Sequence, residues 1–344
     1  MYNQYMKWRI ENVKILHVEP SSNCNLSCPQ CARNVLGEYV NPDLMITDLP
    51  MHWFTELLPM NFIKQLEKVY FCGCFGDPCM HRELLNIIDF LKSTNPNLVI
   101  GINTNGSIRN PAWWSDCAKL LSHDRDYVMF AIDGLEDTNH IYRKNAQWHK
   151  IIDNVNAYIS AGGKALWEYL VFKHNQHQVE QAKQLASELG FNWFNTKVTR
   201  RFANKPIKGI EPIEESQQVN YEKLDIHCEM LHKNEIYVSS YGWVLPCCHI
   251  GEELIDYDQN KKQRRSKLLN ALGVRNGNLS KFKLENNSLD KIIDQFNNIN
   301  DTWLMPSYSQ GKQPVCAETC GMIKNNIAIQ QQWKERKEFN ASND

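Results

Sequence analysis

Three cysteines close to the N-terminus constrain this chain more than any other feature of its sequence. They are Cys24, Cys28 and Cys31, in the run Cys-Asn-Leu-Ser-Cys-Pro-Gln-Cys. A cubane iron-sulfur cluster held by protein alone takes four thiolates, and a structural zinc site also closes with four ligands. Three thiolates in one loop leave one metal corner open for a ligand that is not protein, which indicates chemistry at the metal.

Two plainer interpretations of these cysteines stay open. A zinc site could borrow His17, although an extended chain would carry that residue roughly 20 Å from Cys24 unless it folded back. Disulfides are disfavoured because the twelve cysteines occur without a signal peptide or a long apolar run. This pattern predicts a reducing, cytoplasmic location with no membrane segment.

Size and charge restrict the class of protein further. A chain of 344 residues is long enough for one large domain and one small one. Its net charge of -1 gives no electrostatic footprint for nucleic acid or an anionic membrane. The one basic cluster, within 261–267, is predicted to be a solvated loop.

Short apolar runs alternate with amphipathic segments over the first 200 residues, as a parallel α/β fold requires. Six strands are expected, at 13–18, 68–72, 98–102, 127–132, 166–172 and 193–198. Helices are expected at 53–66, 83–91, 113–121, 151–159 and 179–189. Asn110 and Pro111 have the features of a helix start, while Gly162, Gly163 and Gly190 lie where left-handed helix caps are expected.

The cysteine spacing and the Asn-Leu pair after Cys24 resemble the cluster loop of the radical S-adenosylmethionine (SAM) enzymes. The resemblance implies that Cys24, Cys28 and Cys31 hold three irons of a 4Fe-4S cluster and that SAM chelates the fourth. It also implies reductive cleavage of SAM to a 5′-deoxyadenosyl radical, which abstracts hydrogen from a substrate. The family core is a partial (β/α)6 TIM-like barrel, which agrees with the six expected strands.

Further motifs of this family follow the later strands, where the active-site loops of a barrel gather. The run Gly73 to Pro78 resembles the motif that meets the SAM amino group, with Asp77 in place of the commoner Glu. Ala131 replaces the Ser of a second motif. The resemblance implies SAM contacts from Gly76, Asp77, Asn105, Asp133, Arg143 and Asn175. Taken singly, such residues are more often turn or cap residues, and Glu19 equally fits a strand end or a SAM or substrate contact.

The second half contains another cysteine series. Thirteen residues separate Cys228 from Gly242, four separate Gly242 from Cys247, and three separate Cys316 from Cys320. This order resembles the twitch module, a shortened form of the SPASM module. It implies one auxiliary 4Fe-4S cluster on Cys228, Cys247, Cys316 and Cys320, with Cys248 as an alternate ligand. A four-cysteine zinc knuckle is the structural alternative.

The expected organisation is a radical SAM core at 1–202, a linker at 203–225 and a twitch-type module at 226–344. The expected function is oxidation or other modification of a peptide or protein, with an electron donor such as flavodoxin or ferredoxin. A small-molecule dehydrogenase or rearrangement enzyme and a non-catalytic electron-transfer protein are the alternatives. Cys74 and Cys79, beside the glycine motif, are candidate hydrogen-atom donors or radical relays.

Overall fold

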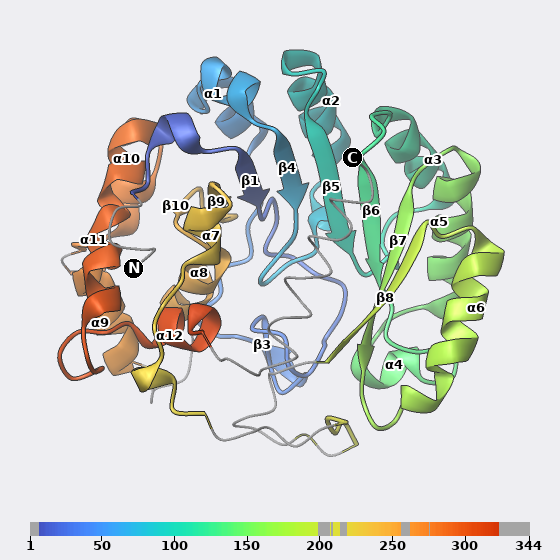
Figure 1. Ribbon diagram of the computed structural model, residues 1–344. Helices are drawn as coiled ribbons and strands as arrows, with labels where there is room; N and C mark the ends of the chain where they lie inside the picture. The colour runs from blue at the N-terminus through green and yellow to red at the C-terminus, as the bar shows by residue number, and fades with distance from the viewer. Residues whose placement is uncertain are drawn as a thin grey trace.

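A single eight-stranded sheet organises the computed structural model, which describes residues 7–198, 207, 209–213, 219–255, 262–274 and 276–322. The strand order is β10-β9-β1-β4-β5-β6-β7-β8, and all neighbours are parallel except β9 and β10. Helices flank the sheet on its outer side (Figure 1). This arrangement confirms the expected α/β, TIM-like architecture.

All six expected strands are present. They are β1 (Ile15–Val18), β4 (Lys68–Phe71), β5 (Val99–Thr104), β6 (Tyr127–Ala131), β7 (Ala165–Val171) and β8 (Trp193–Val198). Most residues of the central strands are buried, as strands with helices on one face and a filled interior on the other require.

The helices after these strands also match, with one exception. They are α1 (Met60–Gln65), α2 (Leu84–Thr94), α3 (Pro111–Leu120), α5 (Trp148–Ser160) and α6 (Val179–Leu189). The single helix expected at 53–66 is wrong, because a π-helical turn at Trp53–Leu57 ends before Pro59, which is extended and precedes α1. Asn110 accepts a hydrogen bond from Trp113 N at 3.0 Å, and Gly190 adopts φ 84°, so both caps are confirmed.

The C-terminal part contributes two strands that the sequence did not predict. Strand β9 (Glu235–Val238) lies parallel beside β1, and β10 (Val244–Leu245) pairs antiparallel with β9. Six helices follow or flank them: α7 (Glu229–His232), α8 (Cys248–Leu254), α9 (Lys262–Ala271), α10 (Leu289–Gln295), α11 (Asn297–Asn300) and α12 (Pro314–Cys320). The solvated loop expected at 261–267 is wrong from residue 262 onwards, because these residues begin α9; residue 261 lies outside the described residues.

The expected domain boundaries stay predictions. Residues 199–202 of the core, 203–206, 208 and 214–218 of the linker and 256–261, 275 and 323–344 of the module lie outside the described residues. Within the described ranges, β9 and β10 belong to the same sheet as the barrel strands.

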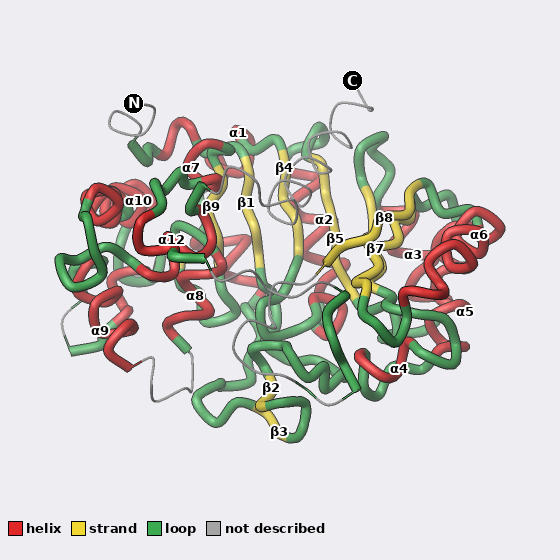
Figure 2. The backbone as a smooth tube through the Cα atoms, turned by 60° about the horizontal axis from the view of Figure 1, so that its bottom comes forward, coloured by secondary structure: helices red, strands yellow, loops and turns green. Residues whose placement is uncertain are grey.

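Shorter elements decorate this framework. They are the hairpin β2 (Asn34–Val35) and β3 (Tyr39–Val40), helix α4 (Asn139–Tyr142) and 3-10 turns at Ile10–Asn12, Pro78–Met80, Gln176–Gln178, Tyr221–Lys223, Leu279–Phe282 and Asp301–Leu304. Figure 2 shows the hairpin projecting beyond the end of the sheet, below the loops that follow the strands. In the part of the chain that the structure describes, no helix has the length and apolar character needed to cross a bilayer.

Candidate active site

The three N-terminal cysteines lie in the loop after β1. The amide of Cys31 donates to the carbonyl of Cys28 at 3.1 Å, and Asn34 N donates to Cys31 O at 2.9 Å. The amide of Leu26 points at the Cys24 sulfur, 3.4 Å away. These contacts fold the loop back on its own backbone, and one of them also holds the Cys24 sulfur.

Burial raises the pKa of two of these thiols, those of Cys28 and Cys24. It raises the pKa of Cys28 to about 11, although the positive charge of Arg143 opposes the shift. The pKa of Cys24 is raised by burial and by the negative charge of Asp77. Metal ligation requires thiolates, so a cation bound at the loop must stabilise the ionised form of these buried thiols. Thiolates are soft ligands, and they fit the iron of an iron-sulfur cluster.

The zinc alternative for this loop receives no support from the position of His17. Its Nε2 atom lies 2.8 Å from the carbonyl oxygen of Cys72, and its ring stacks on Tyr70. Among the described residues, no three Cys, His, Asp or Glu side chains form a group ready to hold one metal ion.

The glycine-rich loop after β4 packs directly on the cysteine loop. A Cβ atom on Gly76 would lie 1.9 Å from the carbonyl oxygen of Ser21, so only glycine allows this approach. The amide of Asp77 donates to Asn23 O at 2.8 Å, immediately before the first cysteine. The two loops therefore form one backbone assembly at the carboxyl ends of β1 and β4.

The carboxylate of Asp77 is buried and is satisfied by the chain itself. It accepts hydrogen bonds from Thr104 Oγ1 at 2.9 Å and from both the amide and the side chain of Asn105 at 2.8 Å. The Asn105 amide group also lies 3.0 Å from Asn25 Oδ1 and 3.9 Å from the Cys24 sulfur. Asp77 thus holds Asn105 against the cysteine loop.

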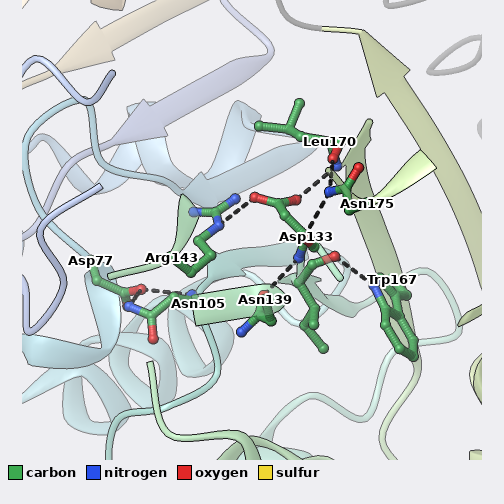
Figure 3. A network of polar contacts seen from close by, with 9 residues as sticks. Asp77, Asn105, Asp133, Asn139, Arg143, Trp167, Leu170 and Asn175 are labelled. Carbon is green, nitrogen blue, oxygen red and sulfur yellow. Dashed lines mark hydrogen bonds and ion pairs between the residues drawn. The ribbon is translucent and has the colours of Figure 1, made fainter. Parts of the chain in front are cut away.

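A second network joins the ends of β6 and β7 (Figure 3). Asp133 accepts a 2.6 Å hydrogen bond from Arg143 Nε and a 2.7 Å bond from the amide of Leu170. Asn175 donates to the carbonyls of Asp133 and Leu170 at 2.8 and 2.9 Å. Burial raises the pKa of Asp133, and the charge of Arg143 opposes the shift. Arg143 also faces Cys28, so this network reaches the cysteine loop.

The structure therefore brings the expected SAM-site residues together at one edge of the sheet. Most of them are held there by hydrogen bonds or ion pairs to one another. Gly76, Asp77 and Asn105 contact the cysteine loop directly, while Asn175 lies on the far side of Asp133. Sequence reasoning did not assign Glu19, whose buried carboxylate accepts from Phe75 N at 2.6 Å. The feature of the sequence that could have indicated this role is its position one residue after β1.

The four cysteines expected to hold an auxiliary cluster line a single cavity. This cavity is small, about 20 Å³, and lies between α7, α8 and α12. The lining consists mainly of thiols and apolar side chains, among them Cys228, Cys247, Cys316 and Cys320. Burial raises the pKa of Cys316 to about 12, while a hydrogen bond from the Cys228 thiol lowers that of Cys320 to about 7. A soft metal group fits this donor set.

Cys248 lies elsewhere, although it follows Cys247 directly. Its carbonyl oxygen is 3.7 Å from the Cys74 sulfur. Its thiol interacts with the thiol of Cys74 and with the side chain of His17. Cys74 in turn contacts the first loop, because its carbonyl oxygen lies 3.8 Å from the Cys31 sulfur. Cys79 is completely buried in the main apolar core. Cys74 is therefore the one of the two catalytic candidates that touches a cysteine of the loop.

Comparison with known proteins agrees with this geometry. A family model described as the radical SAM superfamily matches residues 18–186. A cysteine-type anaerobic sulfatase-maturating enzyme of Clostridium novyi (strain NT) is 23% identical over 156 residues. That match spans 42% of this chain but only 40% of the relative.

Two solved structures share the fold. The protein anSMEcpe with bound AdoMet has a TM-score of 0.52 and 13% identity, covering 96% of this chain and 93% of that one. Streptococcus suis SuiB, bound to its precursor peptide SuiA, has a TM-score of 0.51 and 12% identity, covering 88% and 76%. The family match, the fold and the cysteine loop agree, and residues 18–186 of the chain form a radical SAM domain.

Proposed function

We propose that this protein is an enzyme that uses a 4Fe-4S cluster and SAM to abstract hydrogen from a peptide or protein substrate. Cys24, Cys28 and Cys31 would supply the three thiolates of the cluster. When bound, the two cofactors supply reductive cleavage of SAM to a 5′-deoxyadenosyl radical. The observation that carries the proposal is the contact between the cysteine loop and the loops that follow β4 and β5.

The residues around the cysteine loop have distinct tasks in this proposal. Arg143 places a positive charge beside Cys28, which favours the thiolate. Asp77 orients Asn105 towards Cys24, and the absence of a side chain on Gly76 brings backbone carbonyls and amides to the same edge. Burial of Asp77, Asn105 and Asp133 excludes water from this network. Direct SAM contacts by Gly76, Asp77, Asn105, Asp133, Arg143 and Asn175 belong to the proposal.

The auxiliary site completes the proposal. Cys228, Cys247, Cys316 and Cys320 would hold a second 4Fe-4S cluster with no open position, and Cys247 is preferred to Cys248 because only Cys247 is among the cavity-lining residues. A fully ligated cluster suits electron transfer from the substrate radical. The external electron donor would be a small redox protein such as flavodoxin or ferredoxin.

A peptide or protein substrate is supported by what the related structures contain. SuiB was solved with a precursor peptide and anSMEcpe with the Cp18Cys peptide. The matched curated relative is named as a sulfatase-maturating enzyme, which acts on a protein. A small-molecule substrate would use the same cofactor residues and differ in the substrate pocket.

Anaerobic reconstitution with metal analysis tests the proposal. The wild-type chain should bind about eight irons, and about four should remain after either Cys24→Ala/Cys28→Ala/Cys31→Ala or Cys316→Ala/Cys320→Ala. With reductant and SAM, the wild type and the Cys316→Ala/Cys320→Ala variant should release 5′-deoxyadenosine. The Cys24→Ala/Cys28→Ala/Cys31→Ala variant should not.

Three outcomes would count against parts of the proposal. Zinc in the second site would replace the auxiliary cluster with a structural knuckle. A protein that binds about eight irons but never cleaves SAM would be an electron carrier. If the enzyme converts small molecules but none of a panel of cysteine-containing and serine-containing peptides, the assignment of a peptide substrate is wrong.

A further inference from the structure

A buried carboxylate links the glycine-rich loop to the C-terminal half of the chain. Glu19 follows β1 directly and is completely inaccessible to solvent. Its Oε1 atom accepts from the amides of Phe75 and Gly76 at 2.6 and 3.0 Å. Its Oε2 atom accepts from the Tyr237 hydroxyl at 2.7 Å. One side chain therefore ties the loop after β4 to strand β9.

The position of Tyr237 relates this contact to the second cysteine site. Its ring packs so closely on helix α8 that a Cβ atom on Gly251 would lie 2.8 Å from the ring. The amide of Gly251 donates to the carbonyl of Cys247, which lines the second cavity, at 3.4 Å. The contacts thus run without a gap from Cys247 through Gly251 and Tyr237 to Glu19.

We propose that Glu19 is a positioning residue for the SAM-binding loop and that Tyr237 makes this positioning depend on the C-terminal module. The inference rests on the proposed function, which assigns the loop at Gly76 to SAM. Glu19 acts through the amides of Phe75 and Gly76 and does not touch SAM or substrate, because its carboxylate is enclosed by these three donors. Loss of the Tyr237 hydroxyl leaves one buried carboxylate oxygen without this donor and lets the side chain turn away from the loop.

Four variants separate this role from a general structural one. Tyr237→Phe removes the hydroxyl and keeps the ring. Tyr241→Phe is the matched control, because its hydroxyl bonds to the main chain of Met45 in the same part of the molecule. Glu19→Ala removes the acceptors. Glu19→Gln keeps one acceptor oxygen for the two amides and replaces the other oxygen with an NH2 group, which can donate to the Tyr237 oxygen.

Two measurements are made on each full-length variant. Amide hydrogen exchange at Phe75 and Gly76 is followed in the protein as isolated, and the dissociation constant for SAM is measured after cluster reconstitution. Tyr237→Phe should raise the SAM dissociation constant about tenfold and accelerate exchange at both amides. Glu19→Ala should do the same or more. Tyr241→Phe and Glu19→Gln should stay within about twofold of wild type.

Several results would overturn the inference. Unchanged exchange and unchanged SAM affinity in Tyr237→Phe would remove the link to the module. If Glu19→Gln binds SAM as weakly as Glu19→Ala, acceptor geometry is not what matters. If Glu19→Gln binds SAM normally but no longer cleaves it, Glu19 has a direct chemical role. Failure of the wild type to bind SAM would contradict the proposed function, while the exchange data would still test the contact of Glu19 with the loop.

Discussion

At the residue scale, two buried carboxylates of the site are satisfied in different ways. Asp77 accepts hydrogen bonds from Thr104 and Asn105, which are neutral donors, whereas Asp133 forms an ion pair with Arg143. The side chain of Asp133 is fully buried and that of Arg143 is 18% exposed. Removal of the arginine would leave a negative charge in the interior without its compensating cation.

Arg143→Met should therefore destabilise the protein strongly. We expect the free energy of unfolding to fall by about 3–5 kcal/mol, measured by chemical denaturation of the apoprotein. Lys119→Met is the matched control, because Lys119 and Asp116 form a 2.9 Å pair whose side chains are 68% and 62% exposed. It should change the same quantity by less than about 1 kcal/mol. Equal small effects of the two substitutions would show that Asp133 does not need its cation.

The order of residues along the chain was enough to predict that these side chains gather, but not what each one binds. Gly76, Asn105 and Asp133 follow successive parallel strands, so a barrel must bring them to one edge. The partners of Asp133 depend on the relative placement of the β6 and β7 ends, which no sequence pattern specifies. The same holds for Glu19, because its partner Tyr237 lies on a strand that periodicity did not reveal.

At the scale of elements, one arginine clamps three helices of the C-terminal region. Arg264 on α9 pairs with Glu253 on α8 at 2.9 Å and with Glu318 on α12 at 2.8 Å. Helix α12 carries Cys316 and Cys320, so the clamp holds the helix from which two cavity-lining thiols extend. The charges of this segment suggested a loop because such tertiary ion pairs leave no periodic signal.

Arg264→Met should loosen this region selectively. After anaerobic reconstitution, we expect loss of up to about four irons per chain and retention of the first cluster, as judged by SAM cleavage. Arg264→Lys should recover only part of the iron, since an ammonium group cannot form the two forked contacts. Arg265→Met is the control, because no ion pair of Arg265 is found in the described part of the chain. Full iron content in Arg264→Met would contradict the role of the clamp.

At the scale of the whole molecule, the sheet continues from the barrel strands into the C-terminal half. Strand β1 has β4 on one side and β9 on the other, and all four residues of β9 are buried. A buried run of four residues has no amphipathic period. Its partner strand is also distant in sequence, because Glu235 of β9 pairs with Ile15 of β1, some 220 positions earlier. For that reason the six barrel strands were predictable from the sequence and β9 was not.

This continuity predicts that the described halves unfold together. Ile236→Ala in β9 should lower the free energy of unfolding by about 2–5 kcal/mol, because the side chain is completely buried. Near-ultraviolet circular dichroism and amide exchange of β1 should report one shared transition. Ile46→Ala, at a side chain that is 46% exposed, should change stability by no more than about 0.5 kcal/mol. Two separate transitions in Ile236→Ala would show that β9 is not part of the cooperative core.

Strand β8 has a further consequence for the behaviour of the protein at high concentration. Within the described residues β8 (Trp193–Val198) pairs only with β7 and is the last strand of the sheet. Its sequence is Trp-Phe-Asn-Thr-Lys-Val, and Lys197 forms an ion pair with Glu168 of β7. Polar and charged residues on an edge strand oppose the docking of a second chain. The sheet thus ends in an edge that resists aggregation.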